Sequence, residues 1–199
     1  MDHYFKSHGY LPEGSLKNSR GQTLDIAAMP AILRTLLVTD GTVTKTLEAY
    51  FWESIAVAHL EQDEVSSTSP LEFLENRNEE ALLDRRIRLV GNPSNITYAY
   101  AHSFIRLDVL PTEFRADLKS GKIGIGEILR ETGLETYREL VDLGEDTIKE
   151  NAGNNSDSSS SNEMRPSEER IIYRTYRIMI NHNPAILVTE KFPVSVYQK

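Results

Sequence analysis

The 199-residue chain contains no cysteine, which excludes a disulfide framework, a zinc–thiolate site and a cysteine nucleophile. It has no run of about 18 apolar residues that could span a bilayer, and its N-terminus lacks the apolar core of a signal peptide. It also lacks a basic cluster, since 22 Lys and Arg face 30 Asp and Glu and the formal net charge is −8. An acidic surface repels phosphate backbones and anionic lipids. We therefore expect a cytoplasmic protein that binds neither nucleic acid nor membranes.

Motifs of metal and nucleotide sites are missing as well. The five histidines show no i,i+4 pair and no neighbouring carboxylate cluster, so we expect no metal site. The glycines of 121–126 (GKIGIG) lack the spacing of a phosphate-binding loop, although backbone N–H groups at such a helix start can bind an anion. There is no G-x-S-x-G motif of a serine hydrolase. The chemistry must therefore come from other residues.

Two polar segments, one at the N-terminus and one inside the chain, are expected to lie outside the packed core. Residues 1–22 are rich in Gly, Ser, Lys and Asn and are interpreted as a flexible arm. Residues 151–169 contain six Ser and four Asn, cannot bury enough apolar surface to offset the cost of ordering, and are interpreted as a disordered loop. Residues 23–199 are then expected to form a single domain.

Hydrophobic periodicity predicts short helices and long hairpins. Helical spacing indicates a helix from Thr23 to a stop at Asp40-Gly41, which Pro30 kinks or splits, and further helices over 42–50 and 111–118 and from residue 124. Strand-like runs at 54–60, 82–90, 96–107, 170–180 and 185–196 include two hairpins, whereas 61–70 is interpreted as an acidic loop and 134–143 fits either helix or strand. Because helices and strands do not alternate regularly, the pattern favours an α+β fold with an antiparallel β-sheet flanked by helices.

Two charged residues fall on apolar strand faces. Alternate residues of a strand share a face, so Arg85 lies with Leu83, Ile87 and Leu89, and Glu190 with Ile186, Val188, Phe192 and Val194. Either the two form a structural ion pair, or a bulge reverses the faces, or both line a buried pocket. In a pocket, the guanidinium would hold a carboxylate bidentately and the carboxyl group would be suited to proton transfer.

Arg174 and Arg177 lie on the strand-like run that precedes the one carrying Glu190. They are expected to be solvated or paired, or to line the same pocket. His102 falls on a run with Tyr98, Tyr100 and Phe104, where a satisfied sheet histidine is more common than a catalyst.

The segments 83–89 (LDRRIRL), 125–129 (IGEIL) and 184–192 (PAILVTEKF), in this order and spacing, resemble those of the chorismate pyruvate-lyases. The similarity extends to 40–45 (DGTVTK) and 100–111 (YAHSFIRLDVLP) and so covers residues 25–197. The chain resembles the archaeal, cyanobacterial and mycobacterial branch more than the ubiquinone-pathway enzymes of enteric bacteria.

The resemblance implies a carbon–oxygen lyase that eliminates pyruvate from chorismate to form 4-hydroxybenzoate, without metal or cofactor. It further implies that Arg85 holds the ring carboxylate, that backbone N–H groups at Val43 and Ile125 help to bind it, and that Glu190 lies beside the ring hydroxyl. Glu190 could be the base or could only orient that hydroxyl. Members of this branch often have a glutamate where this chain has His102.

A non-catalytic role is the alternative. The same fold serves as the effector-binding (UTRA) domain of GntR-type transcription regulators, which bind small ligands and catalyse nothing. Such regulators carry an N-terminal winged helix-turn-helix, for which the 22 residues before Thr23 are too few. The lyase is therefore the expected activity.

Because the sequence shows no metal-ligand pattern, exhaustive chelation with EDTA is expected to leave the turnover of chorismate unchanged. The measurement is the rate of 4-hydroxybenzoate formation before and after dialysis against the chelator. Loss of activity that Mg²⁺ or Zn²⁺ restores would contradict this expectation.

Overall fold

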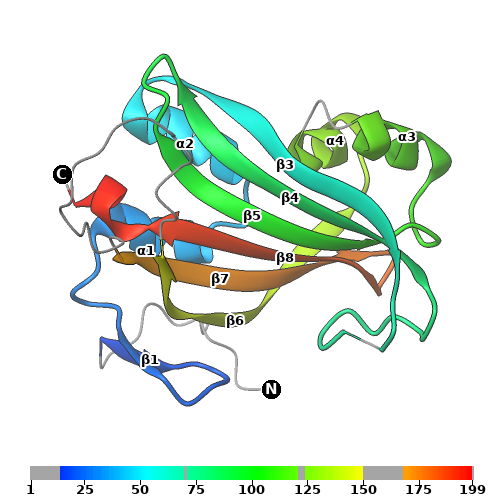
Figure 1. The fold of residues 1–199 in the computed structure, drawn as a ribbon, viewed down its shortest axis with the longest axis horizontal. Coiled ribbons are helices and arrows are strands. Elements are labelled where there is room, and N and C mark those ends of the chain that lie inside the picture. Colours follow the sequence, from blue (N-terminus) through cyan, green and yellow to red (C-terminus); the bar gives the residue numbers. More distant parts are fainter. Residues whose placement is uncertain (1–13, 70, 121–123, 150–167, 199) are drawn as a thin grey trace, which may run out of the picture.

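The computed structural model describes residues 14–69, 71–120, 124–149 and 168–198 (Figure 1). The helices are α1 (Ala31–Val38), α2 (Val43–Phe51), α3 (Thr112–Ser120) and α4 (Ile125–Thr132), and a 3₁₀ turn η1 (Val194–Tyr197) lies near the C-terminus. The strands are β1 (Ser15–Lys17), β2 (Thr23–Asp25), β3 (Ser54–Ser66), β4 (Ala81–Asn92), β5 (Thr97–Arg106), β6 (Thr136–Lys149), β7 (Glu168–Ile180) and β8 (Asn183–Pro193). The predicted α+β class is confirmed.

Six of the strands form one antiparallel sheet in the order β3-β4-β5-β8-β7-β6. Each half is a meander, and the two halves meet where β5 pairs with β8. In this pairing Ser103 lies opposite Val188, and across β4 the same Ser103 lies opposite Arg85. Directly paired residues project to the same face of a sheet, so Arg85 and Glu190 share one face although they belong to different halves.

The helices cover this shared face in two groups. Helices α1 and α2 lie at one end of the sheet and α3 and α4 at the other (Figure 1). The first group packs with Ile87, Leu89 and Phe192 into one hydrophobic cluster, and the second packs with Ile105, Val188 and other residues into a second cluster. The part of the face between the two groups is left for a cavity.

The N-terminal part of the domain differs from the prediction. Helix α1 does not begin at residue 23; Thr23–Asp25 forms β2, which pairs with β1, and the helix begins only after Pro30, whose backbone is extended (φ −50, ψ 139). Leu16 and Leu24 are buried in the main cluster. The predicted flexible arm 1–22 is thus wrong for Ser15–Lys17, which this apolar contact orders, while residues 1–13 lie outside the described residues.

Two further segments are strands where the prediction was wrong or open. Strand β3 continues to Ser66 through the predicted acidic loop, because Glu61 to Ser66 pair with β4 after an irregularity in register, and Glu61 forms an exposed ion pair with Arg86 (Oε2 to Nη1, 2.5 Å). Residues 136–143 of the ambiguous segment belong to β6, which pairs with β7 from Thr136 to Lys149 with one irregularity in register.

The predicted disordered loop 151–169 lies outside the described residues except for its last two. Glu168 and Glu169 are the first residues of β7, and the Glu169 carboxylate accepts a hydrogen bond from Ser195 N (3.1 Å). None of the helices in the described part of the chain has the length and apolarity needed to cross a membrane.

Candidate active site

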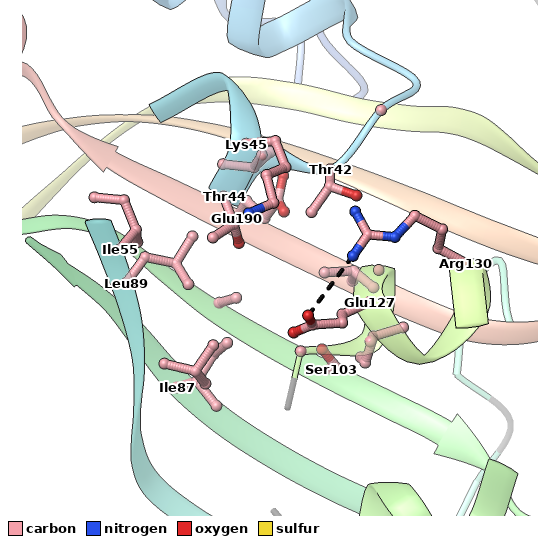
Figure 2. A pocket seen from close by; sticks show the side chains of 18 of the residues that line it. Thr42, Thr44, Lys45, Ile55, Ile87, Leu89, Ser103, Glu127, Arg130 and Glu190 are labelled. Carbon is pink, nitrogen blue, oxygen red and sulfur yellow. Dashed lines mark ion pairs between the residues drawn. The ribbon is translucent and has the colours of Figure 1, made fainter. Parts of the chain in front are cut away.

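A cavity of about 460 Å³ lies between the sheet and the beginnings of α2 and α4 (Figure 2). Its walls combine apolar side chains of the strands with a small number of charged and hydroxyl groups, the usual make-up of a small-molecule site. The lining includes Ile55, Val57, Arg85, Ile87, Leu89, Ala101, Ser103, Tyr176, Ile178, Val188 and Glu190 from β3, β4, β5, β7 and β8, together with Arg138 from β6.

The four residues to which the resemblance gives a role in substrate binding all line this one cavity. Arg85 and Glu190 come from β4 and β8, and Val43 and Ile125 are the first residues of α2 and α4. The predicted inward faces of both strands are confirmed, because Arg85 and Glu190 are buried with their apolar neighbours. The cavity therefore joins two charges of opposite sign and two helix starts.

The first residues of α2 and α4 both line the cavity. Thr42, the N-cap of α2, makes no side-chain capping hydrogen bond, and Gly124, the N-cap of α4, has no side chain to make one. The first N–H groups of a helix have no partner within the helix and carry the positive end of its dipole. Gly126 lets the two starts approach, because a Cβ there would lie 3.1 Å from Thr42 Oγ1. This arrangement suits an anion.

Arg85 is 1% exposed in the middle of β4. Burial lowers the pKa of its guanidinium to about 10, so the group is still a cation at neutral pH. Removing a cation from water is costly, and placing it at a cavity wall makes it available to an anionic ligand in surroundings of low dielectric.

Glu190 is held through both of its carboxylate oxygens. Oε2 accepts a hydrogen bond from Arg174 Nε (2.8 Å), and Oε1 accepts one from the hydroxyl of Tyr176 (3.2 Å). Burial raises the pKa of Tyr176, so its hydroxyl stays protonated and donates. Burial opposes the charge of Arg174, but the neighbouring Glu190 outweighs it, and the pKa of Arg174 is raised. Arg174 thus balances the negative charge of the carboxylate, and the two hydrogen bonds fix its orientation.

The ion-pair partner of Glu190 differs from the one considered in the sequence analysis. Its partner is Arg174 on the adjacent strand, and the alternative of a structural pair between Arg85 and Glu190 is wrong. The guanidinium of Arg174 also donates from Nη1 to the carbonyl of Thr39 (2.8 Å), in the connection between α1 and α2. Glu190 is thereby tied to the segment that leads into the start of α2.

Two other sequence candidates do not belong to the cavity. Arg177 pairs with Glu139 (2.8 Å) and Glu75 (2.7 Å). His102 lies on the opposite face of the sheet, where its Nε2 is 2.8 Å from Asp84 Oδ1. Both are satisfied structural residues, as the sequence interpretation preferred.

Sequence reasoning missed Tyr176 and Arg138. Alternation along β7 would have placed Tyr176 on the face of Arg174 and Ile178, so a signal for it existed. Arg138 lies in the segment that fitted helix and strand equally well. Because the side-chain period depends on that assignment, the sequence could not predict which face Arg138 occupies. Lys45, Glu127 and Arg130 are further lining residues, and Figure 2 shows the Glu127–Arg130 pair at the start of α4.

No cluster of three or more His, Asp or Glu side chains able to hold a metal ion occurs among the described residues. The cavity instead offers a buried guanidinium, the starts of two helices and an oriented carboxylate. Such a set can bind a carboxylate at one end and exchange a proton or a hydrogen bond at the other.

Comparisons with known proteins agree in sequence and in fold. A family model described as chorismate pyruvate-lyase Rv2949c-like matches residues 37–198. A chorismate pyruvate-lyase of Mycobacterium leprae is 30% identical over 186 residues, which cover 87% of this chain and 80% of that protein. A putative lyase, MJ0807, of Methanocaldococcus jannaschii is 31% identical over 159 residues, which cover 80% and 76%.

Solved structures similar to this chain include PhnF from Mycobacterium smegmatis. The TM-score is 0.53 at 9% sequence identity, over 79% of this chain and 66% of that one. For the separate effector domain of PhnF the TM-score is 0.51 at 10% identity, over 78% and 90%. At such low identity the similarity concerns the fold alone.

Removal of the Arg174 guanidinium would leave the Glu190 carboxylate buried without its cation. We expect Arg174→Met to lower the free energy of unfolding by about 3–5 kcal/mol, measured by urea denaturation. The matched control is Arg177→Met on the same strand, whose ion-pair partners are more exposed and which should cost about 1 kcal/mol or less. Equal losses in the two variants would contradict the role assigned to the buried pair.

Proposed function

Since the chain belongs to the family of Rv2949c-like chorismate pyruvate-lyases, we propose that it converts chorismate into 4-hydroxybenzoate and pyruvate. The observation that carries this proposal is the convergence of Arg85, Glu190 and two helix starts on one cavity of about 460 Å³. That cavity is of the size expected for a small aromatic acid.

The ring carboxylate of the substrate binds to Arg85 and to the backbone N–H groups of Val43 and Ile125. A planar guanidinium matches a carboxylate with two parallel hydrogen bonds, and the positive ends of two helix dipoles add to the attraction. These groups offset the repulsion between an anionic substrate and a chain with a net charge of −8. Substrate and aromatic product share this carboxylate, so both bind here.

The reaction itself needs little from the protein. A proton leaves the hydroxyl-bearing ring carbon, and the electron pair of that C–H bond becomes a ring double bond. The C–O bond to the enolpyruvyl group breaks, and its electron pair leaves with the enolate, which takes a proton on its methylene carbon to become pyruvate. Protons lost and gained balance, no electrons pass to an acceptor, and aromatisation supplies the driving force. Positioning and polarisation are the remaining tasks.

Glu190 is the group proposed to lie beside the ring hydroxyl and to accept the proton that the ring releases. Its two oxygens are oriented by Arg174 and Tyr176, so the carboxylate needs no reorganisation when the substrate binds. Arg174 and Tyr176 are therefore positioning residues for Glu190.

The direct test is incubation of the purified protein with chorismate, followed by absorbance and mass measurement of 4-hydroxybenzoate and pyruvate. Both products should appear in equal amounts. Binding of 4-hydroxybenzoate without any turnover would instead favour a non-catalytic ligand-binding protein, a role for which the fold shared with the effector domain of PhnF is suited.

Arg85→Ala is expected to weaken the binding of 4-hydroxybenzoate by about 2–5 kcal/mol and to lower turnover. The reason is that the buried Arg85 guanidinium is proposed to bind the ring carboxylate, which substrate and product share. Isothermal titration calorimetry measures the binding. Arg88→Ala, an exposed position on the other face of the same strand, makes the same charge change and should bind the product as the natural protein does. An unchanged Kd for Arg85→Ala would place the carboxylate site elsewhere.

Glu190→Gln keeps the shape of the side chain but removes its proton exchange. We expect kcat to fall by about 10²–10⁴ while the affinity for 4-hydroxybenzoate changes much less. Glu61→Gln, an exposed carboxylate on β3 that pairs with Arg86 outside the cavity, is the matched control and should retain turnover. Circular dichroism and thermal melting report on folding, and a Glu190→Gln variant that stays folded with an unchanged kcat would remove Glu190 from the mechanism.

A further inference from the structure

Chorismate carries two carboxylates, and the groups described so far account for the one on the ring. We infer that Arg138 binds the second carboxylate, that of the enolpyruvyl group, and that the adjoining cavity receives pyruvate after the C–O bond breaks. This inference rests on the proposed function and extends it to the other half of the substrate.

Arg138 lies where the main cavity meets a second one. The second cavity, of about 500 Å³, is bordered by the connection between α1 and α2 and by the edge strand β6, and it shares Arg138 and Tyr176 with the first. Across the sheet the order is β4 with Arg85, then β5, β8 with Glu190, β7 with Tyr176, and β6 with Arg138. The two arginines thus flank Glu190 from opposite sides.

Arg138 differs from Lys45 and Arg130, two other cations that line the cavity, in having no carboxylate partner among the described residues. Lys45 is paired with Glu48 (2.7 Å) and Arg130 with Glu127 (3.6 Å). Among the described residues, no carboxylate lies within ion-pair distance of Arg138. Its Nη1 donates to the carbonyl of Asp40, and its Nε has no hydrogen-bond partner in that part of the chain. The guanidinium therefore has a charge and donor capacity left for a ligand.

The shape of the substrate leads to the same residue. In chorismate the enolpyruvyl ether is attached next to the hydroxyl-bearing carbon, so a ring held between Arg85 and Glu190 directs this group sideways past Glu190. Arg174, Tyr176 and Arg138 are the polar residues that follow across the sheet on that side, and the charge of Arg174 is already paired with Glu190. A cation there neutralises the second carboxylate and also favours the negative charge that develops on the departing enolate.

This assignment separates the ligands by their chemistry. Chorismate and pyruvate possess the enolpyruvyl-derived carboxylate, whereas 4-hydroxybenzoate does not. Arg138 should therefore matter for the substrate and for pyruvate and be nearly indifferent to the aromatic product, in contrast to Arg85.

The test compares Arg138→Met, Arg138→Lys and the control Arg88→Met in the full chain. For Arg138→Met we expect KM for chorismate to rise by about 10–100-fold, kcat to fall, and inhibition by added pyruvate to weaken by a similar factor. The Kd for 4-hydroxybenzoate should stay within about threefold of the natural value, since the product lacks the second carboxylate. Arg138→Lys keeps the charge and should lose less, and Arg88→Met controls for the change in net charge.

Three results would overturn the inference. One is a KM for chorismate that Arg138→Met changes no more than Arg88→Met does. Another is an equal loss of affinity for chorismate and 4-hydroxybenzoate, which would mean that Arg138 acts through its bond to Asp40 and the start of α2. The third is pyruvate inhibition that Arg138→Met leaves unchanged. A natural protein that makes no 4-hydroxybenzoate would instead reject the proposed function, and pyruvate titration of that protein and of Arg138→Met would still decide whether Arg138 binds the carboxylate.

Discussion

The pairing of β5 with β8 is the constraint on which the rest of the structure depends. It is the only strand pairing in the described sheet that joins one meander to the other, and it sets which residue of one half lies beside which residue of the other. A slip of one residue would turn every side chain of one half to the opposite face. Arg85 and Glu190 would then lie on different faces, and no single cavity could contain both. The candidate site is therefore a property of one register.

The inner face of this sheet carries more charge than stability alone would favour. Arg85, Arg174 and Glu190 are all buried, although well-packed apolar residues in such positions are often as stable or more so. These charges also make specific hydrogen bonds: Arg174 donates to the carbonyl of Thr39, and Glu190 accepts from the hydroxyl of Tyr176. Arg138 reaches the next carbonyl of the same connection, that of Asp40. Two arginines from the sheet thus fix the backbone that leads into α2, and the proposed proton acceptor and the proposed carboxylate site are parts of one hydrogen-bonded network.

Much of the site was accessible to sequence reasoning, because period-two alternation decides the facing of a strand wherever one face is apolar. That was sufficient for Arg85 and Glu190. It could not provide the partner of Glu190, which depends on an irregularity in the β7–β8 hairpin. Ile180 pairs with Asn183 and Met179 with Pro184, a register that would bring Arg174 opposite Thr189, and the shift between Ile178 and Met179 places it opposite Glu190 instead. Nothing in the pattern marks such a shift. The helix predicted from Thr23 is confirmed only after Pro30, as α1, because Leu24 and its neighbours fit a helical period but pair with β1 as a strand. Tertiary contact overrode local preference there.

The central pairing also has a consequence for the order of folding. Every other pairing in the large sheet joins strands that follow one another along the chain, whereas β5 and β8 are separated by two helices and two strands. Contacts between distant segments are slow to form because chain closure must precede them. Arg85 belongs to one meander and Glu190 to the other, so neither meander alone holds the complete cavity. A ligand of the proposed site that contacts both halves would therefore be bound only by the fully folded chain, and its binding free energy would be added to that of the last docking step. Binding of such a ligand and pairing of β5 with β8 are therefore thermodynamically coupled.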